Sequence, residues 1–115
     1  MRLFDSDTAE FKPEFGALAS RWEQHGDLGD PPFGVMWCRI DPASATVEDR
    51  HPERELITVT SGAGTVRTAS GQIDVEIGQT VLVASDEAHV ITNRSDTDPL
   101  IVLSVYWMPD EQDAR

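Results

Sequence analysis

The sequence is poor in cysteine and contains no long apolar run. Its single cysteine, Cys38, excludes an internal disulfide, and a lone thiol fits a reducing compartment. The first residues, MRLFDSDTAEF, include acids and lack the apolar core of a secretory signal. No run approaches the roughly 20 apolar residues that a membrane span needs. We therefore expect a cytoplasmic protein that does not cross a membrane.

Basic residues are also scarce. Nine lysines and arginines stand against 21 aspartates and glutamates, so the formal net charge is −12. Nucleic acids and anionic membrane surfaces bind through basic patches that neutralise phosphate. The charge balance therefore argues against both as partners.

Several catalytic motifs are missing. The chain has no G-x-S-x-G nucleophile turn, no glycine-rich phosphate loop, no G-x-G-x-x-G and no C-x-x-C. The reactions that depend on these motifs are therefore excluded. Cys38 alternates with Trp37 in an apolar stretch, and we expect it to be a small buried residue and not a nucleophile.

What the sequence does contain is a series of short apolar runs between residues 33 and 107. Turn residues separate them at a spacing of roughly ten residues, which is typical of an all-β sandwich or barrel. The 115 residues suffice for one domain, with the barrel at about 33–109, an N-terminal extension at 1–32 and a polar tail at 110–115. We predict strands in FGVMWCRI, ELITVTSG, TVRTA, QIDVEI, QTVLVA, AHVITN and PLIVLSVYW.

The N-terminal extension has a different pattern. Phe15, Leu18 and Trp22 stand at positions i, i+3 and i+7, which is the spacing of one face of an α-helix. A short amphipathic helix between Pro13 and Gly26 is therefore predicted. An extended segment is the alternative, because glycine within this stretch is a poor helix former.

One charged stretch, EDRHPEREL, contains the side chains best suited to bind a metal or to catalyse a reaction. Asp49, His51, Glu53 and Glu55 are spaced by two, so they share a face if an extended strand begins that early. A second histidine, His89, opens a later strand after two predicted hairpins. Imidazole and carboxylate groups together suit Zn, Fe, Mn, Ni or Co. A metal site inside the barrel is therefore the leading hypothesis.

The spacing of these residues resembles that of the cupins, a family of small antiparallel β-barrels with a metal site inside. The first cupin motif is G, five residues, H-x-H, three or four residues, E, six residues, G, and residues 43–62 carry His51 and Glu55 at this spacing. The second motif is G, five residues, P-x-G, two residues, H, three residues, N, and residues 78–93 carry His89 at its histidine position. The resemblance implies a jelly-roll-like antiparallel β-barrel.

The chain departs from the two motifs at four positions. Asp49 stands where the family has its first histidine, and Ala43 stands where the first motif has its leading glycine. Ala84 and Asp86 replace the proline and glycine of the second motif. The second pair of replacements is expected to change a turn and not a ligand.

The resemblance implies one divalent transition metal, held by His51, Glu55 and His89. Asp49 either occupies the fourth ligand position or stays free as a general base. Glu53 is a second candidate for acid–base catalysis, with a solvated surface charge as the alternative. The sequence does not distinguish among Zn, Fe, Mn, Ni and Co.

Three further side chains are candidates for a substrate pocket. Trp37 and Arg39 share one face of the strand predicted at residues 33–40, and Arg39 either holds a substrate carboxylate or forms an ion pair at the rim. Tyr106, near the end of the last predicted strand, is placed to donate a hydrogen bond to a ligand. Its neighbour Trp107 is then expected to face the opposite way.

Two functions follow from the resemblance. The first is a metal-dependent enzyme acting on a small molecule, such as an isomerase, cyclase, lyase or decarboxylase, or an oxygenase if the metal is iron. Enzymes of this size in the family resemble tailoring enzymes of bacterial secondary metabolism. The alternative is a non-catalytic barrel that binds a metabolite or sugar, with a degenerate metal site. A homodimer is expected in either case.

Overall fold

The structure is a computed structural model that describes residues 1–110. Nearly half of these residues form antiparallel strands, and the helical residues among them are the four of one 3-10 helix, so the predicted all-β fold is confirmed. None of the described helices is long and apolar enough to span a membrane. The predicted tail lies outside the described residues from position 111 onward. The elements are β1 Lys12–Glu14, β2 Ala17–Arg21, the 3-10 helix η1 Trp22–His25, β3 Gly34–Ile40, β4 Arg54–Ser61, β5 Ala63–Thr68, β6 Gly71–Glu76, β7 Thr80–Val83, β8 His89–Asn93 and β9 Leu100–Trp107.

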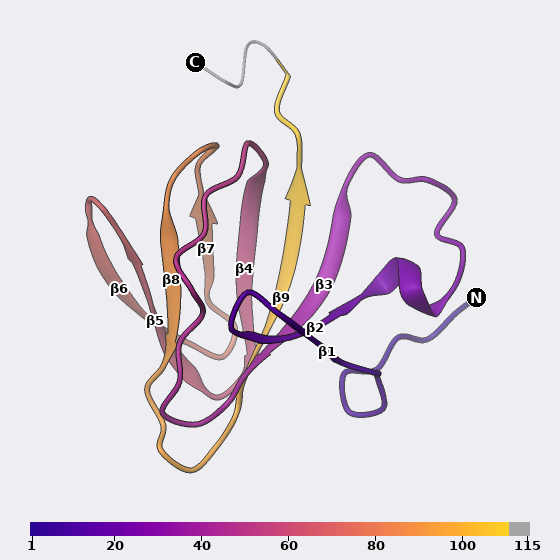
Figure 1. Cartoon of the computed structure of the whole chain (residues 1–115). Coiled ribbons are helices and arrows are strands. Elements are labelled where there is room, and N and C mark those ends of the chain that lie inside the picture. Colours follow the sequence, from indigo (N-terminus) through magenta and orange to yellow (C-terminus); the bar gives the residue numbers. More distant parts are fainter. Residues whose placement is uncertain (111–115) are drawn as a thin grey trace.

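The strands form two sheets. The larger has six strands in the order β1-β2-β3-β9-β4-β7, and the smaller has three in the order β6-β5-β8. Figure 1 shows the small sheet on the left and the large sheet curving to the right. Every strand predicted between residues 33 and 107 is present within two residues of its expected bounds. Short turns join most of these strands, which is why their sequence signals were readable.

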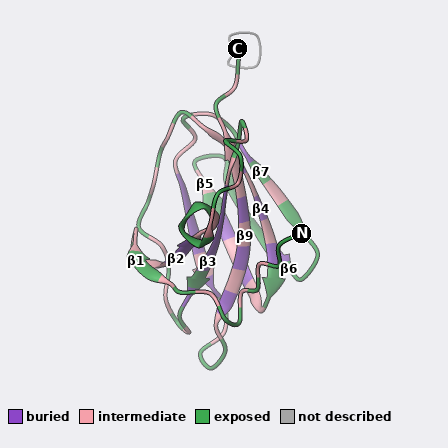
Figure 2. Cartoon of the chain, turned by 90° about the vertical axis from the view of Figure 1, so that its right-hand side faces the viewer, coloured by how far each residue is buried: buried purple, intermediate pink, exposed green. Residues whose placement is uncertain are grey.

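The core lies between the two sheets. β3, β4 and β9 each turn alternate side chains inward, as the two-residue period of a strand requires. Figure 2 shows buried residues concentrated along these three strands. The small sheet contributes Val66, Val75 and Ile91 to the same cluster. The largest fully buried apolar side chains are Ile40, Ile57, Leu100, Val59, Val83 and Val102.

The helix predicted between Pro13 and Gly26 is wrong, and the extended alternative is what the structure contains. β1 and β2 form a hairpin whose turn residues, Phe15 and Gly16, have left-handed φ angles of 38° and 79°. β2 then pairs with β3 in antiparallel register. The backbone groups of β3 would otherwise form an open sheet edge, and pairing them outweighs the weak helical spacing of the side chains. Only the 3-10 turn of η1 is helical in this stretch.

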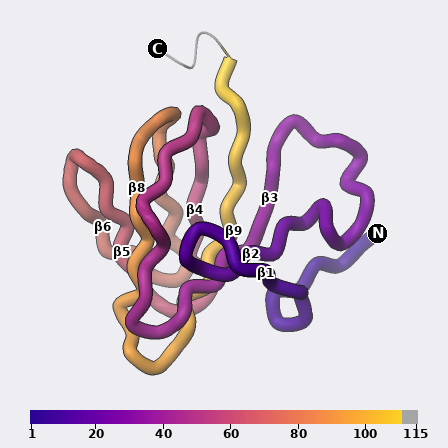
Figure 3. The backbone as a smooth tube through the Cα atoms, viewed as in Figure 1, coloured from indigo at the N-terminus to yellow at the C-terminus, as the bar shows by residue number. Residues whose placement is uncertain are grey.

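The β1–β2 hairpin closes one side of the barrel. Its tip meets the irregular segment that precedes β4, where the Val47 amide donates to the Phe15 carbonyl at 2.9 Å. Figure 3 shows the hairpin crossing next to this segment. Gly16 permits this contact, because a Cβ atom there would lie 3.1 Å from Val47. The hairpin thereby carries Phe15 to the wall of the internal cavity described below.

Asn93, the last residue of the second motif, has a structural role. Its side-chain amide donates to the backbone carbonyls of Ile40, Asp41 and Asp98 at 3.0, 3.2 and 2.8 Å. Its side-chain oxygen accepts from the Ser95 amide at 2.9 Å. A buried amide with this many partners ties the end of β3 to the loop between β8 and β9.

Two of the four departures from the motifs occupy positions that glycine would suit. Ala43 has a φ of 57° and Asp86 has a φ of 60°, both in the left-handed region that costs most L-residues free energy. Both residues therefore adopt a backbone conformation that glycine would adopt at lower cost. At the second turn the Asp86 amide donates to the His51 carbonyl at 2.8 Å, so this conformation helps to position the metal-site segment.

We predict that Ala43→Gly stabilises the protein. Relief of the left-handed strain gains about 1–2 kcal/mol, and the added freedom of glycine in the unfolded chain costs about 0.4–1 kcal/mol. The net gain in unfolding free energy is expected to be roughly 0.5–1 kcal/mol, measured by urea denaturation. Ala45→Gly, in the backbone bridge to Thr92, is the control and should destabilise. A loss of stability in Ala43→Gly would contradict the assigned backbone strain.

Candidate metal centre

The site forms where the segment before β4 meets β8. Asp49 and His89 exchange two backbone hydrogen bonds, of 3.1 and 3.0 Å, in an isolated antiparallel bridge. β4 begins only at Arg54, close to the predicted start at Glu55, so the condition under which all four residues would share one strand face is not met. The proline at position 52 lies in a bend. Asp49 and His51 reach the cavity through pairing with β8, and Glu55 reaches it from β4.

Both imidazole rings are fixed in the same tautomer. His51 Nδ1 lies 3.0 Å from the Glu53 carbonyl, and His89 Nδ1 lies 2.9 Å from the Glu87 carbonyl. A carbonyl oxygen only accepts, so each Nδ1 carries the hydrogen. Each Nε2 is then left facing the cavity, which is the arrangement that metal-binding histidines use. The two rings meet edge to face, with centroids 5.1 Å apart.

Glu55 is the point on which both rings converge. Its Oε1 lies 3.1 Å from His51 Nε2 and 3.2 Å from His89 Nε2. Its Oε2 accepts a hydrogen bond from the hydroxyl of Ser104, and the glutamate is buried. Two neutral Nε2 lone pairs would repel this carboxylate oxygen. Positive charge, from a proton or a metal ion, is therefore required between the three atoms.

Asp49 and the two histidines form a donor set that suits a metal ion. One ligand atom each from Asp49, His51 and His89 lie within 4.8 Å of one another. Nitrogen from imidazole with carboxylate oxygen is a suitable donor set for divalent zinc, iron, manganese, nickel or cobalt. The aspartate that replaces the first motif histidine thus remains in the site. Its side chain also accepts from the Arg50 amide at 2.9 Å.

The electrostatics of the site favour opposite charges on Glu55 and His89. Burial by itself would raise the pKa of Glu55, but hydrogen bonds from His89 and Ser104 and the nearby imidazoles outweigh it, and the pKa is lowered. Burial likewise opposes the charged form of His89. The hydrogen bonds to Glu55 and to the Glu87 carbonyl, with the charges of Glu55 and Asp49, nonetheless raise its pKa.

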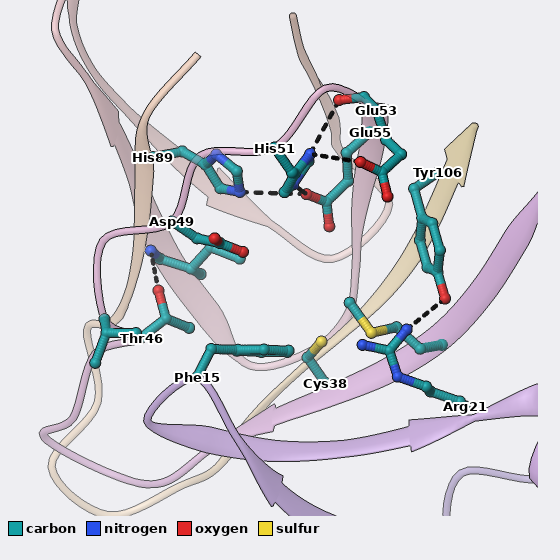
Figure 4. A pocket seen from close by; sticks show the side chains of 13 residues that line it. Phe15, Arg21, Cys38, Thr46, Asp49, His51, Glu53, Glu55, His89 and Tyr106 are labelled. Carbon is teal, nitrogen blue, oxygen red and sulfur yellow. Dashed lines mark hydrogen bonds and ion pairs between the residues drawn. The ribbon is translucent and has the colours of Figure 1, made fainter. Parts of the chain in front are cut away.

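The donors open into a cavity of about 210 Å³. Figure 4 shows the histidines and carboxylates on one side of it, and Phe15, Cys38 and Arg21 on the other. Tyr106 and Glu53 also line the cavity. Cys38 is buried, and burial raises the pKa of its thiol to about 12, so it stays protonated. The apolar walls are formed by Phe15, Met36, Cys38, Val47 and Ile91.

The prediction that Trp37 and Arg39 line the pocket is wrong, because both lie on the other face of β3. Met36 and Cys38 face the cavity, so the strand period turns Trp37 and Arg39 outward. Trp37 packs against Trp22 with ring centroids 5.2 Å apart. Arg39 has a half-exposed side chain 4.0 Å from Asp41, which corresponds to the rim ion pair. The sequence pattern showed which residues share a face and left open which face points inward.

Sequence reasoning missed two polar residues of the site. Ser104 lies within an apolar run, two positions before Tyr106, and that spacing was the available signal that it faces the cavity. Arg21 lies in the stretch interpreted as a helix, and only its pairing with β3 brings it to the cavity. Its guanidinium donates to the Tyr106 hydroxyl at 2.6 Å.

Comparisons with known proteins agree with this fold. Residues 36–106 match the family model described as "Cupin domain". A solved protein of Photorhabdus luminescens superposes with a TM-score of 0.80 at 23% identity, covering 99% of this chain and 90% of that one. A Silicibacter pomeroyi structure described as a sugar phosphate isomerase from a cupin superfamily gives 0.73 at 22%, covering 94% and 76%. A predicted oxalate decarboxylase of Thermotoga maritima gives 0.75 at 16%, covering 94% and 100%. At these identities the likeness concerns the fold.

We predict that the metal-free protein owes stability to the Glu55–His89 pair in a weakly acidic window. Because folding lowers the pKa of Glu55, its carboxylate contributes to the free energy of unfolding above pH 4.5, the ordinary pKa. This contribution is lost as the pH falls through the pKa of the folded protein. Because folding raises the pKa of His89, its imidazolium contributes fully to the free energy of unfolding below pH 6.5, the ordinary pKa. This contribution is lost as the pH rises through the pKa of the folded protein.

The stability difference between wild type and His89→Gln, both without metal, should therefore be largest between pH 4.5 and 6.5. Urea denaturation across a pH series measures it. A difference that stays constant with pH, or that grows above neutrality, would contradict the ion pair.

Proposed function

The chain belongs to the cupin family, and on that premise we propose that it is an enzyme that acts on a small molecule with the help of one divalent transition metal. His51, Glu55 and His89 would hold the ion, with Asp49 as the fourth ligand or as a free base. The observation that carries the proposal is the convergence of two Nε2 atoms, at 3.1 and 3.2 Å, on one buried carboxylate oxygen.

The local hydrogen bonds support a metal more strongly than the histidines alone would. A histidine on a strand is commonly just packed or solvated, and nothing then fixes its tautomer. Here each Nδ1 is held by the carbonyl of a residue two positions away, and Ser104 holds the far oxygen of Glu55. Supporting groups of this kind orient ligands before an ion arrives.

The residues around the site suit proton transfer. When bound, a divalent ion supplies a Lewis acid that polarises a substrate oxygen. Asp49 is placed to take a proton from a substrate carbon or hydroxyl if its carboxylate is not a ligand. Glu53 lines the cavity with its carboxylate 3.9 Å from His51 Nδ1. Its partly exposed side chain is suited to exchanging that proton with solvent.

We place the reaction among those driven by proton transfer next to a polarised oxygen, such as isomerisation, cyclisation, elimination or decarboxylation. Cupin-fold structures described as a sugar phosphate isomerase and a predicted oxalate decarboxylase lend support to this class. With iron the same site would suit oxygenation. A cytoplasmic location and a homodimer, as expected for small cupins, complete the proposal.

A second function has one observation in its favour. Asp49 replaces a motif histidine, and an additional carboxylate gives the site a different charge and ligand strength from the family's usual set. A barrel that binds a metabolite or sugar without reaction is consistent with a site weakened in this way. Retention of one equivalent of metal by the wild type would favour the enzyme over this alternative.

We predict that the purified, untagged protein carries close to one equivalent of a single transition metal. His51→Ala and His89→Ala should each lose most of it. Loss of a group that only supports a ligand already costs about 10–100-fold in metal affinity, and loss of the ligand itself costs more. Inductively coupled plasma mass spectrometry measures the content, and zinc titration of the metal-free protein measures the affinity.

His25→Ala is the matched control, because this exposed imidazole on η1 bonds to Ser20 outside the cavity. It should keep the metal content of the wild type. Absence of metal from the wild type, with no uptake on titration, would contradict the proposed function. Equal loss in the His25 variant would show that the effect is not specific to the site.

A further inference from the structure

The wall of the cavity away from the imidazoles carries a second polar group. Tyr106 on β9 and Arg21 on β2 both line the cavity, and Figure 4 shows their side chains meeting there, apart from Asp49 and His89. The Arg21 Nη1 atom lies 2.6 Å from the Tyr106 hydroxyl oxygen. Because a guanidinium only donates, the tyrosine oxygen is the acceptor.

The sheet is shaped to allow this contact. β3 lies between β2 and β9, and Gly34 of β3 is directly opposite Tyr106. A Cβ atom at Gly34 would lie 2.1 Å from the tyrosine ring. The missing side chain therefore lets the ring lean across β3 to reach Arg21, one strand further on. Any other residue at this position would displace the hydroxyl.

Glu14 holds the arginine in place. Its carboxylate accepts from Arg21 Nε at 3.2 Å and from Nη2 at 2.9 Å, a two-pronged pair that fixes the guanidinium plane. The pair also balances the arginine charge. The main effect of Arg21 on the cavity is therefore to orient the Tyr106 hydroxyl. Its positive charge is already balanced by Glu14.

The hydroxyl hydrogen of Tyr106 has no acceptor among residues 1–110. Its only hydrogen bond within this part of the chain is the one that its oxygen accepts from Arg21. Burial raises the pKa of the phenol, against the opposing effect of Arg21, so the hydrogen is retained at neutral pH. A retained donor beside a cavity is a group available to a ligand, because leaving it unpaired costs free energy.

The space between the two polar walls is small and mainly apolar. Its volume is about 210 Å³. Drug-sized ligands occupy cavities of about 300–1,000 Å³. Phe15, Met36, Val47 and Ile91 supply apolar contacts. The cavity therefore suits a short molecule with an apolar middle.

We propose that the Tyr106 hydroxyl, positioned by Arg21, donates a hydrogen bond to a carbonyl oxygen of the substrate, and that the substrate class is small oxo acids. The ion that His51, Glu55 and His89 would hold would bind the carboxylate end, an assignment that rests on the proposed function. The carbonyl end meets Tyr106. A neutral oxygen suits this wall, because Glu14 already balances Arg21.

The test compares two probes of equal length, 4-oxopentanoate and pentanoate, which differ by one carbonyl. Their affinities for the zinc-loaded protein are measured by NMR titration. The wild type should bind 4-oxopentanoate roughly three- to tenfold more tightly, the value of one hydrogen bond. Tyr106→Phe should abolish that preference and keep its pentanoate affinity, which also shows that the variant is folded.

Two arginine variants separate positioning from charge. Arg21→Gln should lose most of the carbonyl preference while its pentanoate affinity changes little, because the hydroxyl is no longer aimed. Arg39→Gln, which removes an outward-facing arginine, is the matched control and should keep the preference. An unchanged preference in Tyr106→Phe, no preference in the wild type, or no binding of either probe to the loaded protein would overturn the proposal.

Repeating the titration after chelation separates this inference from the proposed function. Removal of zinc should weaken the binding of both probes and leave the ratio of their affinities unchanged. If the protein takes up no metal but prefers 4-oxopentanoate through Tyr106, the proposed function fails and the role of Tyr106 stands. If it takes up metal and shows no carbonyl preference, the substrate class fails alone.

Discussion

The site depends on one electrostatic repulsion, between two imidazole nitrogens and a carboxylate oxygen, that a bound metal ion or a proton would remove. Two imidazole nitrogens, on His51 and His89, point at the same oxygen of buried Glu55. Neither ring can turn its other nitrogen to the cavity without losing a hydrogen bond to a backbone carbonyl. The other oxygen of the Glu55 carboxylate accepts a hydrogen bond from the Ser104 hydroxyl. The three groups are therefore stable together only with positive charge between them.

The rest of the barrel serves to keep these groups in place. The bridge between Asp49 and His89 brings the segment before β4 to the edge of β8. The left-handed turn at Asp86 adds a hydrogen bond to the His51 carbonyl. On the other side, the β1–β2 hairpin inserts Phe15 and makes the cavity small. A rigid sheet thus supplies both the charged wall and the limits on ligand size.

Much of this arrangement was predictable, and the exceptions have physical causes. His51, Glu55 and His89 were identified by spacing, since motif spacing survives the loss of motif residues. The choice of face on β3 was not predictable, because strand alternation shows which residues share a face and does not show which face is inside. Arg21 was missed because local helical spacing gave no information about the open sheet edge that its strand completes.

The central claim is that both imidazoles bind one ion directly. X-ray absorption at the zinc edge of the zinc-loaded protein tests it most directly, because imidazole gives a characteristic outer-shell scattering. Direct binding by both rings predicts two imidazole nitrogens at about 2.0–2.1 Å and carboxylate oxygens at about 2.0–2.2 Å from the zinc. A zinc environment containing oxygen alone, with no imidazole contribution, would contradict it.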